Sequence, residues 1–152
     1  MRHRAAAMAR PFAKEKAVCL RWKGIMPISY VIDKQNRLVV GTATGVLTAD
    51  DILQVWRLSM SDPDFDANFS QLGDLSAVTR VDLTAAEVRM LAESNPFPRT
   101  MYNAIVGESP EVYGLARMFS IVRGLRGDER TTRVFRTREE ALAWLLQKDQ
   151  AA

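Results

Sequence analysis

Apolar residues recur along this chain with two different periods, and the changes from one period to the other divide it into strands and helices. Short segments rich in Val and Ile or other apolar residues predict strands at residues 28–32, 38–46, 69–75, 101–106 and 131–135. The first two segments flank turn-forming residues, which predicts a β-hairpin. The fourth segment is apolar almost throughout, as is typical of a buried central strand.

Apolar residues at intervals of three and four predict the helices that separate these strands. A residue of the N-cap type stands before each predicted helix: Thr48, Thr84, Ser109 and Thr137. Glu87 and Glu140 stand three residues after two of these caps and complete the pattern of a capping box. In a capping box the hydroxyl and the carboxylate each accept a bond from the other residue's backbone N–H.

The resulting order is two strands followed by alternating helices and strands. This order predicts an α/β fold: a mixed, largely parallel sheet of about five strands with four helices packed on it. A chain of 152 residues has the length of one domain, which we place at residues 26–148. We expect residues 1–25 to lie outside it, as a disordered extension or as an upstream addition from a start codon before Met26.

The basic character of the chain comes from its N-terminus. Residues 1–25 contain seven Lys and Arg residues and one Glu, so the net charge of +3 for the whole chain leaves −3 for the remainder. This balance argues against general nucleic-acid binding by the domain. No apolar segment approaches the roughly 20 residues that cross a bilayer. We therefore expect a cytoplasmic protein without an integral membrane segment.

The predicted domain lacks the side chains on which most enzymes rely. The single His and the single Cys are His3 and Cys19, both in the N-terminal extension. Imidazole acid–base chemistry, thiol catalysis and a Cys/His zinc site are therefore not expected in the domain. Asp62, Asp64 and Asp66 alternate as in a calcium loop, but the Gly and the closing Glu of such a loop are missing. We expect no cofactor and no metal, and we rank an enzyme behind the binding functions.

The most informative motif lies between the third strand and the second helix. Asp74, Ser76 and Thr79 predict a turn there. Asp82 and Thr84 are then expected on the loop that enters the helix, where backbone amides are exposed. The spacing Asp-Leu-Ser-x-Val-Thr-x-x-Asp-x-Thr in this stretch resembles the signature loop of STAS domains, the anti-sigma-factor-antagonist fold.

The resemblance implies a regulatory role for Thr84. In STAS domains the loop carries an Asp, two hydroxyl residues and a Gly, and the second hydroxyl is the phosphorylation switch of the regulatory members. Asp82 falls on the Asp and Thr84 on the switch, whereas Leu83 replaces the first hydroxyl and Ala85 the Gly. A phosphate on Thr84 would add nearly two negative charges at a helix N-terminus, where amides and dipole can receive them. The alternative is that Thr84 only caps its helix, together with Glu87.

From Met26 onward, about five-sixths of the chain is similar to the SEC14/STAS-like group of small bacterial proteins, whose function is uncharacterised. Residues 26–30, 62–66 and 113–118 carry this similarity. The comparison with SEC14-type lipid carriers implies an apolar ligand pocket, for which the candidates are Phe97, Met101, Tyr102, Tyr113, Met118 and Phe119. Ordinary core packing is the alternative for these side chains.

Arginine is concentrated in the last third of the chain: Arg117, Arg123, Arg126, Arg130, Arg133, Arg136 and Arg138. Such a cluster can bind phosphates or acidic partners, and a solvated face balanced by nearby Asp and Glu is the alternative. Overall the sequence predicts a non-enzymatic regulatory or protein-interaction module whose surface includes Asp82, Thr84 and Glu87. A carrier or sensor of a small apolar ligand is the second hypothesis, and a homodimer through an exposed helix or sheet edge stays open.

Overall fold

The computed structural model describes residues 27–125 and 131–151. The elements run in the order β1 (Ile28–Asp33), β2 (Leu38–Thr48), α1 (Ala49–Ser61), β3 (Ser70–Asp82), α2 (Ala85–Ser94), β4 (Asn103–Val106), α3 (Pro110–Gly124), β5 (Thr132–Phe135) and α4 (Arg138–Ala151). This is the order that the hydrophobic pattern predicts. The prediction for residues 1–25 lies outside the described residues.

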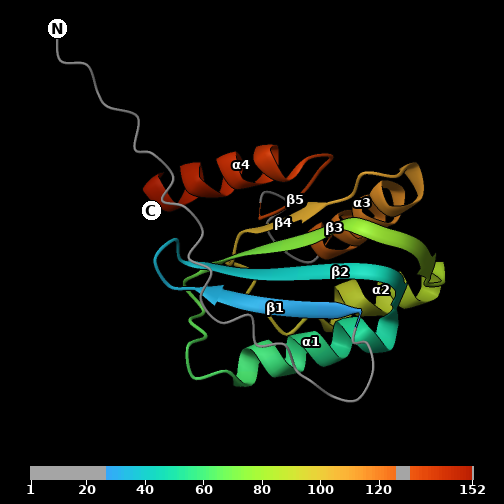
Figure 1. The fold of residues 1–152 in the computed structure, drawn as a ribbon, viewed down its shortest axis with the longest axis horizontal. Helices are drawn as coiled ribbons and strands as arrows, with labels where there is room; N and C mark the ends of the chain where they lie inside the picture. The colour runs from blue at the N-terminus through green and yellow to red at the C-terminus, as the bar shows by residue number, and fades with distance from the viewer. Residues whose placement is uncertain (1–26, 126–130, 152) are drawn as a thin grey trace, which may run out of the picture.

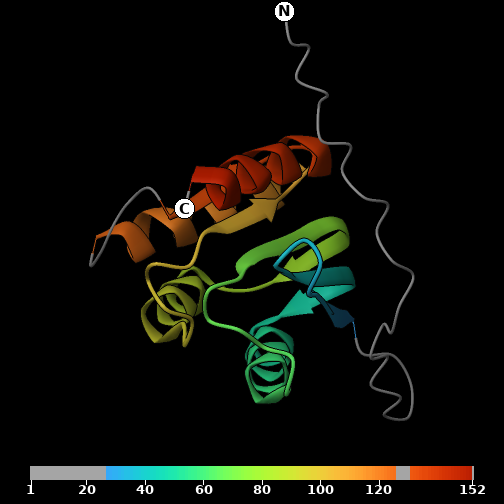
Figure 2. The same cartoon turned by 90° about the vertical axis from the view of Figure 1, so that its left-hand side faces the viewer.

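The strands form one mixed sheet in which spatial order follows chain order, β1-β2-β3-β4-β5. β1 and β2 are the predicted antiparallel hairpin, and every later pair of neighbours is parallel. Each crossover therefore moves one strand in the same direction, and such crossovers are right-handed almost without exception. As a consequence, α1, α2 and α3 lie on one face of the sheet, whereas α4 turns back over the other (Figures 1 and 2).

The alternation of side chains along the strands gives each face of the sheet its own core. In β4, Ala104 and Val106 pack with Leu145 of α4, whereas Ile105 packs with residues of α1, α2 and α3. All residues of β4 are buried, which confirms that the fourth strand is an interior one. Trp144 of α4 is buried beside Leu145, between the helix and the sheet.

The predicted turn after the third strand is wrong, because β3 continues through Asp74, Ser76 and Thr79 as far as Asp82. The reason is the length of β2, which pairs with β3 along this whole stretch with two register shifts. Gly45 of β2, at φ 67°, lies at one of these shifts. The side chains of Asp74 and Ser76 bond to each other within the strand instead of forming a turn.

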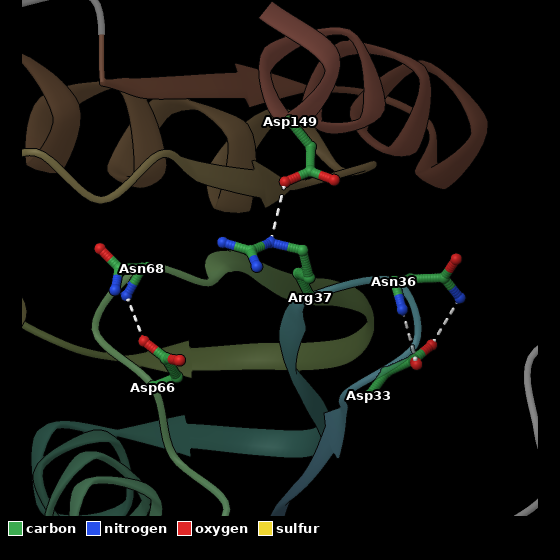
Figure 3. A network of polar contacts seen from close by, with 6 residues as sticks. All are labelled: Asp33, Asn36, Arg37, Asp66, Asn68 and Asp149. Atoms are coloured by element: carbon green, nitrogen blue, oxygen red, sulfur yellow. Dashed lines mark hydrogen bonds and ion pairs between the residues drawn. The ribbon is translucent and has the colours of Figure 1, made fainter. Parts of the chain in front are cut away.

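The turn between β1 and β2 contacts the C-terminal part of α4 (Figure 3). Within the turn, the Asp33 carboxylate accepts bonds from the backbone N–H and the side-chain amide of Asn36, at 3.1 and 2.7 Å. Arg37 follows with a positive φ of 54°, and its Nε donates to Asp149 of α4 at 3.1 Å. Both partners of this ion pair are well exposed, so it positions the end of α4 without adding much stability.

Candidate functional site

Four helix N-termini gather where the parallel strands end, which in α/β folds is the edge where ligands and partners bind. Each is capped by a hydroxyl that accepts from the backbone N–H three residues later: Thr48 at 3.3 Å, Thr84 at 3.1 Å, Ser109 at 3.2 Å and Thr137 at 3.3 Å. All four caps were predicted from local sequence. Thr84 and Ser109 are exposed, whereas Thr48 is half-buried.

Thr84 forms the complete capping box that the sequence predicts. Its Oγ1 accepts from the Glu87 N–H at 3.1 Å, and its own N–H donates to Glu87 Oε2 at 2.8 Å. The hydroxyl also lies 3.2 Å from the same carboxylate oxygen. Asp82, Ala85 and Ala86 around it are exposed, so the hydroxyl lies on an open surface with two carboxylates nearby in sequence.

The arginines of the last third have separate contacts. Arg133 lies over aromatic rings of β5 and α4, with its guanidinium 6.0 and 5.9 Å from their centroids. Arg136 lies 4.2 Å from the centroid of a ring of α3. Arg138 binds a carboxylate of β3. Arg126 and Arg130 lie outside the described residues.

The carboxylate that Arg138 binds is that of Asp74, a buried residue on the α4 face of the sheet. It accepts from Arg138 Nη1 at 2.9 Å, from the Ser76 N–H at 3.0 Å and from the Ser76 hydroxyl. Burial alone raises the pKa of Asp74, but the hydrogen bonds from Ser76 and Arg138 outweigh it and hold the pKa below its ordinary value. The carboxylate therefore stays ionised and joins the first turn of α4 to β3.

An apolar cavity of about 150 Å³ lies between the sheet and the three helices α1, α2 and α3. Gly41 of β2 and Gly73 of β3 stand opposite each other in its wall. A Cβ added at either position would meet nothing closer than 3.9 Å. Trp56, Leu91 and Phe119 line the cavity from the helices. Two glycines in adjacent strands thus leave a hollow that side chains fill elsewhere.

Of the six residues predicted to form an apolar pocket, Phe119 alone lines this cavity. Met118 packs against the cluster that contains Phe119 without lining the cavity. The remaining four pack in other places: Phe97 and Met101 beside Phe69, Tyr102 against Trp144 with ring centroids 5.7 Å apart, and Tyr113 against Arg136. The structure therefore does not bring the six together. The signal in the sequence is the glycines themselves, because a glycine inside a strand contributes no side chain to the core.

Neither a metal centre nor a membrane helix is found in residues 27–125 and 131–151. No three His, Cys, Asp or Glu side chains in these ranges are grouped so that they could hold a metal ion. The helices in the same ranges are too short or too polar to cross a bilayer. The arrangement offers instead a capped, exposed helix terminus and a neutral cavity.

Solved structures that share this fold include the following two. One is an uncharacterised protein of the DUF3478 family with a SpoIIAA-like fold from Shewanella loihica PV-4, at 20% identity and a TM-score of 0.52, covering 82% of this chain and 98% of that chain. The other is an anti-sigma factor antagonist from Mycobacterium paratuberculosis, at 16% identity and a TM-score of 0.51, with the same coverage. No family model and no curated protein matches the sequence. The chain has a SpoIIAA-like α/β fold, which confirms the predicted STAS-like architecture.

Proposed function

We propose that this chain is a non-enzymatic regulatory module that binds a protein partner through the surface around Thr84, and that phosphorylation of Thr84 switches this binding. The observation that carries the proposal is the exposed hydroxyl within the capping box of α2. A second support is the fold, because one solved structure with the same architecture is an anti-sigma factor antagonist.

The geometry around Thr84 gives phosphorylation a local effect. The Glu87 carboxylate oxygen that lies 3.2 Å from the hydroxyl would be repelled by a phosphate. The phosphate would in turn accept from the N-terminal amides of α2, where the helix dipole favours negative charge. Val88 and Leu91 beneath this turn are buried and need not move. The modification would thus change the charge of the docking surface and leave the core intact.

The switch is tested on protein purified at native levels from its source organism. Native mass spectrometry with site mapping reads the modification and any partner in the same sample. We expect a phosphoryl group on Thr84, and we expect Thr84→Glu to alter the affinity for the co-purified partner. Ser109→Glu is the matched control, because Ser109 is also an exposed helix N-cap. The switch would be refuted if neither Thr84→Glu nor Ser109→Glu changed the affinity for the partner and no phosphorylated protein were found.

The cavity supports a second candidate function, the carrier or sensor of a small apolar ligand. Its volume of about 150 Å³ is that of an engineered protein cavity that binds benzene. The space therefore suits a ligand of about one ring rather than a long-chain lipid. The same native spectra test this function: a bound small molecule that is absent from a Gly73→Val variant supports it. A ligand-free spectrum together with no binding of added aromatic compounds refutes it.

A further inference from the structure

Two amide side chains line the cavity without a hydrogen-bond partner among the described residues. Gln71 of β3 and Asn103 of β4 stand opposite each other in the parallel register. Asn103 is only 6% exposed. The backbone N–H groups of both residues are already bonded, that of Gln71 to the Tyr102 carbonyl at 2.8 Å and that of Asn103 to the Thr131 carbonyl at 2.7 Å. The backbone hydrogen bonds at this point therefore do not depend on the two side-chain amides.

The amide atoms of these two residues are not fully enclosed by protein, so a molecule in the cavity can bond to them. Buried polar side chains in folded proteins are almost always hydrogen-bonded. Val39 of β2 is paired with Gln71 in the same row across the sheet. Its apolar side chain packs in the core and has no polar group that needs a hydrogen bond. Two adjacent amides in this row point to a ligand that supplies the missing bonds.

We propose that the cavity binds an uncharged molecule of about one ring in size, whose hydroxyl, carbonyl or amide group bonds to Gln71 and Asn103. This inference rests on the second candidate function and names its ligand class. An amide pair offers both donors and acceptors, so it can serve either side of a neutral polar group. Among residues 27–125 and 131–151, no Lys, Arg, Asp or Glu lines the cavity, and a charge buried there would have no partner from these residues.

The position of the glycines completes the match to such a ligand. Gly73 lies two residues beyond Gln71 on the same face of β3, a rise of about 6.6 Å along the strand. A ring over Gly41 and Gly73 would lie on strand backbone, with side chains of the sheet and of the helices around it. Its polar substituent would then be directed along the strands to the amide pair.

The experiment uses the full chain labelled with ¹⁵N and three probes of similar shape: p-cresol, toluene and benzoate. We expect p-cresol to shift the side-chain NH₂ resonances of Gln71 and Asn103 and to bind about tenfold more tightly than toluene, as one additional hydrogen bond to the protein implies. Benzoate should not bind, because its charge has no partner in the cavity.

Variants separate the polar contact from the cavity itself. Asn103→Leu should abolish the preference for p-cresol while toluene still binds, and Gln71→Met serves the same purpose if the first variant does not fold. Gly73→Val fills the hollow and should abolish binding of both. Equal binding of p-cresol and toluene with unmoved amide resonances, as expected if water satisfies the amides, overturns the inference but leaves the ligand cavity standing. Binding of benzoate as tight as that of p-cresol also overturns it. Failure of every probe removes the second candidate function together with the inference.

Discussion

Replacing either cavity glycine by alanine should stabilise the protein. Neither Gly41 nor Gly73 has a positive φ, so alanine is free of backbone strain at both positions. The added Cβ would lie 3.9 Å from the Leu72 carbonyl oxygen or 4.0 Å from that of Ala104, which are ordinary contacts. Glycine inside a strand costs about 0.5–1 kcal/mol relative to alanine, and burying a methyl group adds about 0.8 kcal/mol. We expect each substitution to raise the free energy of unfolding by about 1–2 kcal/mol.

Replacement by alanine should lower the free energy of unfolding at two other glycines. At Gly107, a Cβ would lie 3.0 Å from Val112 Cγ1 and 3.1 Å from the backbone nitrogen of Tyr113, and a backbone atom cannot move aside cheaply. Overpacking of this kind costs about 1–3 kcal/mol. At Gly45, the space is open, but the φ of 67° costs a residue with a Cβ about 1–2 kcal/mol.

Urea unfolding of the four variants measures these differences. With a slope of about 2 kcal/mol per M, the midpoints of Gly41→Ala and Gly73→Ala should rise by about 0.5–1 M. The midpoints of Gly107→Ala and Gly45→Ala should fall. If the cavity variants were destabilised as much as Gly107→Ala, the hollow would not be open to a methyl group. The explanation of the cavity by its paired glycines would then be refuted.

Three further substitutions test the polar contacts. Asp74→Asn should lower the free energy of unfolding by about 2–3 kcal/mol at neutral pH. Because the pKa of Asp74 is lowered in the folded state, this difference from wild type should shrink below about pH 4, which urea unfolding at several pH values measures. Thr84→Ala should lower the thermal unfolding free energy by about 1 kcal/mol, and no loss would contradict its capping role. Tyr30→Phe should cost about 1 kcal/mol through the lost bond to Asp62. Burial raises the pKa of Tyr30 to about 12. The free energy of unfolding of the wild type should therefore fall as pH rises from about 10 to 12, and that of Tyr30→Phe should not show this fall.

The helices were predictable because their signals are local. Thr48, Thr84 and Ser109 cap helices that begin at the next residue, and the apolar spacing that follows needs no knowledge of distant partners. The end of β3 was not predictable in this way. Asp74 is typical of a turn, and it lies in a strand because β2 pairs beside it and because Arg138, 64 residues away, binds its carboxylate.

The candidate pocket shows the same limit in another form. Met101 and Tyr102 are neighbours in sequence and were predicted to line one cavity. Met101 ends a turn that its N–H closes with the Pro98 carbonyl, and it packs with Phe97 beside Trp56 of α1. Tyr102 instead packs against Trp144 of α4. The cavity depends on the register that places Gly41 opposite Gly73, and register is a property of the paired strands rather than of either segment.

The arrangement of α4 has a consequence for how this protein is made. Among the described elements, α4 alone covers one face of the sheet, and it lies C-terminal to every strand. A ribosome releases the chain from the N-terminus at about 5–20 residues per second, so the strands emerge before their cover. Until α4 follows, that face presents an uncovered apolar surface: Leu38, Val40, Leu72, Ala104 and Val106. A sheet that formed before α4 was synthesised would therefore expose an aggregation-prone face, which packing of α4 covers.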